Sequence, residues 1–194
     1  MSTTTPQSPL NRRPQRADAR RNYDKLIAAA REAFTERDRS ASLEDIARRA
    51  DVGIGTLYRH FPARADLIEA VYVEEVEALC ASADDLGDAP PWEALVDWLG
   101  RFVGYVATKQ ALADELFALP DHDSDVFKAC RGALISTGEP LLGRAQKAGS
   151  VRPDVTIDEV LKMVGGIAKI PTADAAAIEH ILGVALDGLR YRAI

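Results

Sequence analysis

The sequence predicts an all-α fold of about nine helices, with three short N-terminal helices followed by a larger C-terminal helical bundle. Apolar residues recur every three or four positions along most of the chain, as on one face of a helix. No segment alternates apolar and polar residues as a half-buried strand does. Clusters of Gly and Pro separate the periodic segments. With 194 residues, 47% of them apolar, the chain can form one large domain or two small ones.

The first periodic segment begins at Ala17 and ends near Arg37, and residues 1–15 before it are polar and aperiodic. We expect residues 1–15 to form a disordered basic arm. Five arginines lie in the arm and at the start of the first helix: Arg12, Arg13, Arg16, Arg20 and Arg21. They either enter the minor groove of DNA or lie along its phosphates, or they belong to a disordered, solvated tail. Both interpretations remain open at this point.

The next two helices are short and are joined by a turn of three residues. Ser42 is a favourable N-cap, and Asp45 three residues later forms the pattern of a capping box. A turn containing Gly53 follows, and a third helix is expected from Ile54 to Phe61. Pro62 ends it, because proline disfavours helical geometry in the residue before it. Two short helices joined in this way form a helix-turn-helix.

The remaining helical patterns belong to the C-terminal part. A long helix is expected from about residue 63 to 83, and the next begins at Pro91. Further helices are predicted over 111–119, over 126–148 with a possible bend at 138–140, over 157–170, and after 174 to the end of the chain. We expect residues 16–62 to be the helix-turn-helix domain and 63–194 to be the ligand-binding and dimerisation domain.

Charge is distributed unevenly along the chain. Residues 1–64 carry 13 Lys and Arg against 8 Asp and Glu, a net charge of +5, whereas the rest carries 11 against 22, a net charge of −11. The first third therefore suits a polyanion although the whole chain has a net charge of −6. There is no long apolar run that would span a membrane and no secretory signal, so a cytoplasmic protein is expected.

The third helix has two distinct faces when it is plotted at 100° per residue. Leu57 and Phe61 fall together and are expected to face the core, whereas Gly55 and Arg59 lie opposite them with Thr56 alongside. An outward face of this kind suits DNA. Glycine lets the backbone approach closely, threonine can contact a thymine methyl, and arginine can bind guanine or a phosphate. We expect Tyr58 and His60 at the edges of this face, and Arg64 after it, to contact phosphates.

Residues 42–72, "SLEDIARRADVGIGTLYRHFPARADLIEAVY", resemble the DNA-binding signature of TetR-family transcriptional regulators. The matching elements are the capped first helix, the "A-x-V-G" turn, "G-T-L-Y-R-H-F" and the following "R-x-D-L". The resemblance covers about residues 17–75. Carried over position by position, it implies DNA contacts by Ser42, Leu43, Ile54, Gly55, Thr56, Tyr58, Arg59, His60 and Arg64.

This chain departs from the family pattern at two positions. Ile54 stands where many members carry lysine, so an apolar contact with a thymine methyl replaces a basic contact. Gly53 stands where serine or threonine often caps the recognition helix. Glycine in place of such a cap lowers helix stability by roughly a few tenths of a kcal/mol. The resemblance implies a homodimer that represses at a near-palindromic DNA operator and is released by a small-molecule effector.

The same resemblance implies that the last two helices pair with a second copy of the chain. Expected interface residues are Val160, Val164, Ile181, Ala185 and Leu189. An effector pocket is implied among the helices before them, and its aromatic or methionine side chains are also ordinary core residues. The candidates, besides Trp92, are Trp98, Phe102, Tyr105, Phe117, Phe127 and Met163. The effector itself is unknown.

No catalytic or cofactor motif competes with this interpretation. The chain has no phosphate-binding loop, no dinucleotide fingerprint and no serine–histidine–aspartate order. The one metal-like cluster, "DHDSD" at 121–125, has too few ligands for a divalent site, so neither a metal nor a cofactor is expected. We expect no enzymatic activity. The alternatives are a helix-turn-helix regulator controlled by a protein partner and an all-α metal-binding or enzymatic bundle.

Overall fold

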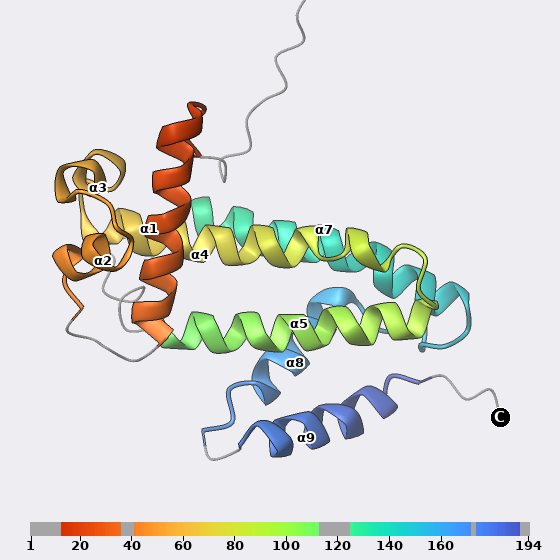
Figure 1. Ribbon diagram of the computed structural model, residues 1–194. Helices are drawn as coiled ribbons and strands as arrows, with labels where there is room; N and C mark the ends of the chain where they lie inside the picture. The colour runs from red at the N-terminus through yellow and green to blue at the C-terminus, as the bar shows by residue number, and fades with distance from the viewer. Residues whose placement is uncertain (1–12, 36–40, 113–124, 172–173, 191–194) are drawn as a thin grey trace, which may run out of the picture. The chain divides into compact units, whose positions relative to one another are not determined.

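The structure is a computed structural model that describes residues 13–35, 41–112, 125–171 and 174–190. Within these ranges it consists of eight α-helices and one short 3-10 helix, with no β-strand (Figure 1). The predicted all-α fold is therefore confirmed. The segment predicted as a further helix, residues 111–119, lies outside the described residues except for its first two.

The chain divides into two compact units. One comprises Met1–Glu75 with Ala111–Cys130, and the other comprises Val76–Gln110 with Arg131–Ile194. The first boundary falls inside helix α4 (Arg64–Ala81), and the last falls inside helix α7 (Asp125–Lys147). These units follow the packing of the chain, and the functional boundary expected after residue 62 remains a prediction.

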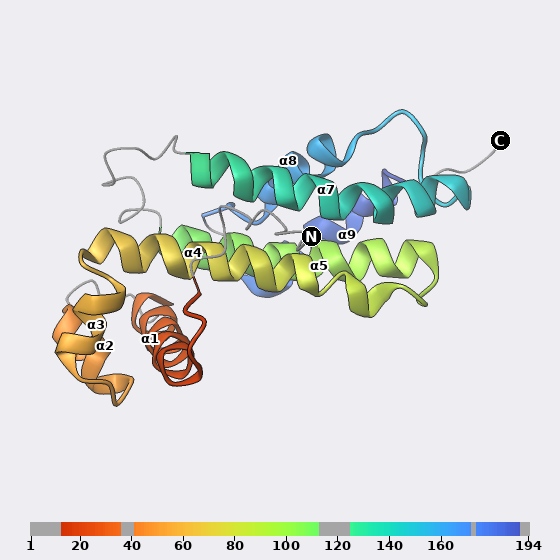
Figure 2. The ribbon, with the colours of Figure 1, turned by 90° about the horizontal axis from the view of Figure 1, so that it is seen from above.

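Three helices of the first unit pack pairwise against one another: α1 (Ala17–Thr35), α2 (Leu43–Arg49) and α3 (Ile54–His60). They form one group in both views of the ribbon (Figures 1 and 2). Each helix contributes apolar side chains to a shared core, and the fully enclosed ones are Leu26, Ala30, Ala33, Ile46 and Leu57. This packing holds α3 in a defined orientation on the domain.

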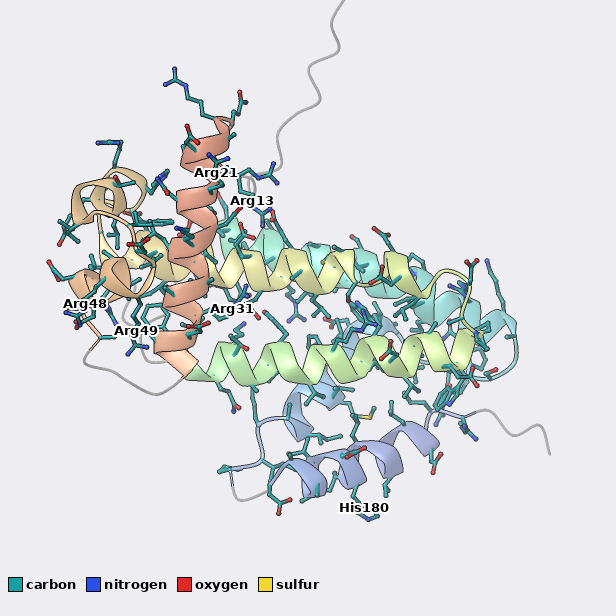
Figure 3. All side chains as sticks on the ribbon, viewed as in Figure 1. Arg13, Arg21, Arg31, Arg48, Arg49 and His180 are labelled. Carbon is teal, nitrogen blue, oxygen red and sulfur yellow. The ribbon has the colours of Figure 1, made fainter. Side chains whose placement is uncertain are left out.

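Two ion pairs join the start of the chain to α4. The Nε atom of Arg13 donates to Glu74 at 2.6 Å, and its Nη2 atom donates to the second carboxylate oxygen. Arg31 of α1, which is labelled in Figure 3, pairs with Glu75, the residue after Glu74. Glu74 is the one buried charged residue among the described residues, with 7% of its surface exposed. A buried carboxylate is costly unless it is paired, so Arg13 offsets that cost.

The second unit is built from the end of α4, a 3-10 helix (Asp84–Leu86), α5 (Pro91–Ala111), most of α7, α8 (Ile157–Ile167) and α9 (Ala175–Asp187). Trp98 of α5 is fully buried, and its Nε1 atom donates to the carbonyl oxygen of Leu79 on α4 at 3.2 Å. Gly138 of α7 lies where a Cβ atom would come within 2.7 Å of Ile157 and 2.9 Å of Trp98. Helices α5, α7 and α8 therefore meet closely at this glycine.

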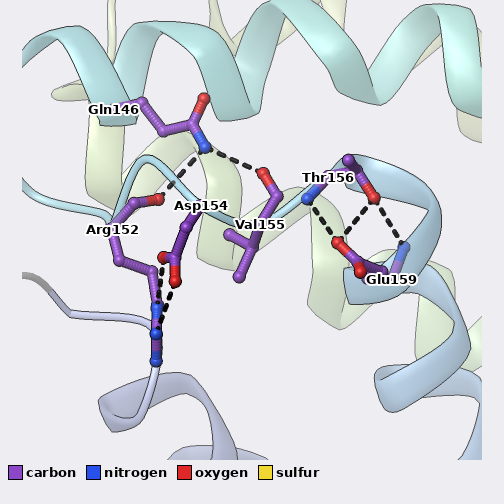
Figure 4. A network of polar contacts seen from close by, with 6 residues as sticks. All are labelled: Gln146, Arg152, Asp154, Val155, Thr156 and Glu159. Atoms are coloured by element: carbon purple, nitrogen blue, oxygen red, sulfur yellow. Dashed lines mark hydrogen bonds and ion pairs between the residues drawn. The ribbon is translucent and has the colours of Figure 1, made fainter.

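The turn between α7 and α8 is held by side-chain hydrogen bonds (Figure 4). The amide of Gln146 donates to the carbonyl oxygens of Arg152, at 3.1 Å, and Val155, at 3.0 Å. Thr156 then caps α8 in a reciprocal capping box with Glu159. The capping box satisfies backbone N–H groups at the start of α8, and the Gln146 amide satisfies two carbonyl oxygens of the connecting turn.

Candidate nucleic-acid interface

Helix α3 has the two faces that its sequence predicts. Leu57 is fully buried and Phe61, directly after the helix, is 3% exposed, which confirms that both face the core. Gly55 and Arg59 are exposed on the other side, and Thr56 is half-buried. Ile54 and Tyr58 are large apolar or aromatic side chains, yet they are 39% and 44% exposed. The outer surface of α3 is therefore apolar and cationic, and it is covered by no described residue.

The beginning of α3 is open. The N-cap, Gly53, makes no side-chain capping hydrogen bond. A Cβ atom added at Gly55 would meet nothing within 4 Å, so packing within the chain does not require glycine there. A molecule that approaches this end can therefore come close to the helix backbone.

Helix α2 begins with the expected capping box. The hydroxyl of Ser42 accepts from the Asp45 amide at 3.1 Å and donates to the Asp45 carboxylate at 2.9 Å. Arg48 pairs with the same carboxylate. The hydrogen bonds from Ser42 are the main cause that lowers the pKa of Asp45. Ser42 is therefore engaged in the cap, and Leu43 after it is half-buried.

His60 packs against the domain as well as lying at the end of α3. Its ring is 6.1 Å from that of Tyr23 on α1 in an edge-on arrangement, and it is half-buried. Burial, and secondly the charge of Arg59, lowers the pKa of His60. This environment favours the neutral form of the imidazole, whose N–H group can donate to a phosphate.

Arg64, in the first turn of α4, joins three segments of the first unit. Its Nη1 atom donates to the carbonyl oxygen of Ala41 at 2.7 Å, and its guanidinium lies 5.1 Å from the ring centre of Phe34. The predicted phosphate contact thus comes from a residue that also supports the entry to α2. Arg59, by contrast, is exposed on α3 itself.

The structure adds one residue that the sequence analysis did not include. Glu44, exposed in the first turn of α2, accepts a hydrogen bond from the hydroxyl of Tyr58 at 3.3 Å. The charge of Glu44 is the main cause that raises the pKa of Tyr58. The two residues are 14 positions apart on different helices, so no local pattern in the sequence indicates this contact.

The expected effector-pocket residues are divided between the two units. Trp98, Phe102 and Tyr105 are buried neighbours along α5, with ring centres 6.4 Å and 5.6 Å apart. Met163 on α8 is half-buried in the same unit. Phe127 belongs to the first unit, where its ring centre lies 4.9 Å from that of Tyr72. Phe117 lies outside the described residues.

The expected dimer residues differ in exposure. Val160, Val164 and Leu189 are buried within the chain, at 2%, 0% and 6% exposure, so they are unsuitable as contact residues and that expectation is corrected. Ile181 is 36% exposed, and Val184, which the sequence analysis did not include, is 63% exposed. The exposed apolar surface of α9 thus contains Ile181 and Val184.

Among the described residues no group of three or more histidine, cysteine or acidic side chains is arranged to hold a metal ion. Residues 121–124 of the predicted weak cluster lie outside that part of the chain. Of the helices within the described ranges, none combines the length and apolar character that crossing a membrane requires.

Comparison with known protein families gives two matches. Residues 90–191 match the model described as "Transcriptional regulator SbtR-like, C-terminal domain", which is more than half of the chain. Residues 26–71 match the model described as "Bacterial regulatory proteins, tetR family". The second match contains all of α2 and α3, and it ends inside α4.

Individual proteins show the same likeness, two of them over most of the chain. The TetR transcriptional regulator SCO0520 from Streptomyces coelicolor is 40% identical, with a TM-score of 0.77, over 88% of this chain and 99% of that one. A TetR transcription regulatory protein from Mycobacterium vanbaalenii is 33% identical, with a TM-score of 0.72, over 91% and 99%. The repressor KstR of Mycolicibacterium smegmatis is 31% identical over 97 residues, and the match spans 46% of KstR, less than half of its length.

Proposed function

Because the chain belongs to the TetR family of bacterial regulatory proteins, we propose that it is a homodimeric repressor that binds a near-palindromic operator and leaves it when a small molecule binds. The predicted class, a DNA-binding transcriptional regulator and not an enzyme, is confirmed by both family matches. Repression, dimerisation and release by an effector belong to the proposal. The cytoplasmic location expected from the sequence belongs to the proposal as well.

The outward face of α3 is the observation that carries the proposal. A short helix with one face anchored in a three-helix core presents its other face to the major groove of DNA. The residues proposed to contact the operator are those expected from the sequence: Ser42, Leu43, Ile54, Gly55, Thr56, Tyr58, Arg59, His60 and Arg64. Within this set Arg59, Thr56 and Ile54 suit base edges and thymine methyls. The others suit phosphates and positioning.

The exposed apolar side chains of α9 support a homodimer. A valine exposed to 63%, beside the half-exposed Ile181 and the small Gly183, is favoured at a surface that a second helix covers. Two recognition helices in one dimer bind half-sites about 34–36 Å apart, one turn of DNA, or multiples of that spacing. A near-palindromic operator matches the two-fold symmetry of such a dimer.

An effector site is proposed in the C-terminal region. Aromatic side chains along α5, with Met163 on α8, supply the apolar character that small-molecule sites require. Residues from 65 onward have a net charge of −11, which suits a cationic effector. Solvated surface carboxylates produce the same balance, so the proposal names no effector.

Selection from a library of random DNA duplexes tests the proposal. The library is incubated with the full chain, bound duplexes are recovered, and enrichment of a two-fold symmetric motif is the expected result. Affinity for the enriched duplex should decrease steeply with salt, with a slope of roughly −0.9 per phosphate contact on logarithmic axes. Recovery of no motif over repeated rounds would overturn the proposed function.

A further inference from the structure

Glu44 and Tyr58 form an exposed pair across two helices on the surface proposed to meet DNA. The hydroxyl of Tyr58 on α3 donates to the carboxylate of Glu44 on α2 at 3.3 Å. Tyr58 is 44% exposed, and Glu44 is exposed as well. A negative charge lies here beside the recognition helix, on a surface whose other charged groups include Arg48, Arg49 and Arg59.

The number of protons on the pair limits what it can bind. A phenol has one O–H donor, and an ionised carboxylate has none. In this arrangement the Tyr58 hydroxyl donates its hydrogen bond to Glu44, whose negative charge also raises the pKa of Tyr58. The lone pairs of the phenol oxygen and of the carboxylate are what remain for a ligand. The pair therefore presents hydrogen-bond acceptors to any partner that approaches it.

Phosphate is the wrong partner for such a surface. Phosphate oxygens are negatively charged acceptors, so Glu44 repels them and competes with them for the one hydroxyl donor of the pair. A Tyr58–phosphate contact would need the hydroxyl proton to turn away from Glu44 while the carboxylate remained close by. The neighbouring acid, Asp45, is engaged by Ser42 and Arg48, so Glu44 is the carboxylate of α2 whose charge is left at this surface.

Exposed donors in the major groove are the amino groups of two bases, N4 of cytosine and N6 of adenine. We propose that the Glu44–Tyr58 pair is a specificity determinant that accepts a hydrogen bond from such a base amino group. The same pair disfavours binding in which a phosphate group lies beside Glu44. This inference rests on the proposed function and changes the role of Tyr58 from a phosphate contact to a selective one. Glu44 lowers the affinity for every DNA sequence by repelling phosphates. It also favours one base by accepting a hydrogen bond from the amino group of that base.

The test compares Glu44→Gln with the wild-type chain and with Glu139→Gln. Glutamine keeps an acceptor oxygen for Tyr58, removes the charge and adds an N–H donor. Glu139 is exposed on α7 in the second unit, so its variant makes the same change of net charge elsewhere. Equal melting midpoints of the three proteins establish that each is folded.

Binding selection from random duplexes is then repeated with each protein, and affinity for a duplex without the motif is measured. For Glu44→Gln we expect several-fold tighter binding to the duplex without the motif. We also expect the preference for cytosine or adenine to be lost at one position of each half-site, with a loss of specificity of about ten-fold. Glu139→Gln should behave as the wild-type chain does. An unchanged motif and an unchanged specificity ratio for Glu44→Gln would overturn the inference.

A second measurement tests the hydrogen bond itself. At the affected position, the amino group of the base is replaced by hydrogen in a synthetic duplex. The wild-type chain should lose about ten-fold in affinity for this duplex, whereas Glu44→Gln should lose less than about two-fold. Equal losses for both proteins would overturn the inference. Failure of the wild-type chain to enrich any duplex contradicts the proposed function, whereas enrichment with no effect of Glu44→Gln contradicts this inference alone.

Discussion

Single residues on the first unit divide into those that face outward and those that also hold the domain together. Arg59 is exposed on the outer face of α3. Arg64 donates to the carbonyl oxygen of Ala41, and His60 packs on Tyr23. We therefore expect a substitution at Arg59 to act on the proposed DNA binding with little effect on stability, whereas one at Arg64 or His60 should change stability as well.

Arg59→Ala should weaken binding to the selected operator more than binding to unrelated DNA. A bidentate arginine–guanine contact accounts for about 1–3 kcal/mol of discrimination, and a phosphate contact accounts for none. Affinities for the two duplexes, measured at the same salt concentration, give the two losses. Equal losses on both duplexes would show that Arg59 binds phosphate and reads no base. Lys162→Ala on α8 is a control with the same loss of positive charge.

His60 should make stability depend on pH in one direction. The pKa of His60 in the folded chain is lowered from 6.5, so its imidazole binds a proton more tightly in the unfolded chain than in the folded chain. The contribution of His60 to the free energy of unfolding is fully present above pH 6.5, and it is lost as the pH falls through the lowered pKa. Melting midpoints from about pH 7.5 to about pH 5 should decrease less for His60→Gln than for the wild-type chain. Parallel decreases would contradict this assignment.

At the scale of helices, the two units are stabilised in different ways. In the first unit, ion pairs of Arg13 with Glu74 and of Arg31 with Glu75 supplement a small three-helix core. In the second, long helices pack closely, and Gly138 permits contact between α7 and the side chains of Trp98 and Ile157. The ion pairs of the first unit depend on charge, whereas the close helix packing of the second unit depends on the shapes of the side chains.

Gly138→Ala should destabilise the chain although alanine is the better helix former. The added methyl group would lie within 3 Å of Ile157 and Trp98, and overpacking of this kind costs about 1–3 kcal/mol. Gly132→Ala in the same helix is the matched control, because its Cβ would meet nothing within 4 Å. That variant should gain about 0.5–1 kcal/mol from helix propensity. Denaturant unfolding measures both, and a stabilising Gly138→Ala would contradict the packing.

Arg13→Ala should cost more stability than Arg21→Ala. Glu74 is 7% exposed, so removing its partner leaves a buried carboxylate with fewer donors, at a cost of about 1–3 kcal/mol. Arg21 pairs with Asp18 on the surface, where both side chains are mostly exposed, and such pairs contribute about 0–1 kcal/mol. Thermal unfolding at two salt concentrations compares them. Similar midpoints for the two variants would show that Glu74 does not depend on Arg13.

At the scale of the whole molecule, the proposed dimer would link assembly to DNA binding. A dimer presents two recognition helices, so the affinity for a two-fold operator includes the second contact at a high effective concentration. The exposed apolar side chains of α9 are where this assembly is proposed to form. Disrupting that surface should therefore lower DNA affinity without altering any residue of the first unit.

Val184→Glu should convert the proposed dimer to a monomer. It places a charge on the most exposed large apolar residue of α9, where burial against a partner would be costly. Sedimentation should show half the mass of the wild-type assembly, and affinity for the selected operator should decrease at least ten-fold, roughly the loss of one half-site contact. Gln110→Glu, exposed on α5, adds the same charge as a control. If Val184→Glu remained a dimer, the proposed interface on this surface of α9 would be wrong.

Most of the fold follows from patterns that lie within a few residues of one another. Helical periodicity, the Ser42–Asp45 capping box and the placement of Leu57 and Phe61 on one face of α3 were all predictable, because each depends on neighbours three or four positions apart. The predicted helix starts at Ala17 and Pro91 are found in the structure. The family resemblance carried by residues 42–72 is confirmed, and it too is local in sequence.

Contacts between distant positions were decided by the tertiary structure. The Glu44–Tyr58 pair, the packing of His60 on Tyr23 and the burial of Leu189 each join or enclose residues that no local pattern relates. Among the described residues, the sequence by itself determined which helices form and which side of α3 is exposed, because hydrogen bonding and amphipathicity within a helix are local. Only the folded chain decided which of the exposed side chains are engaged, because that depends on which helix lies beside them.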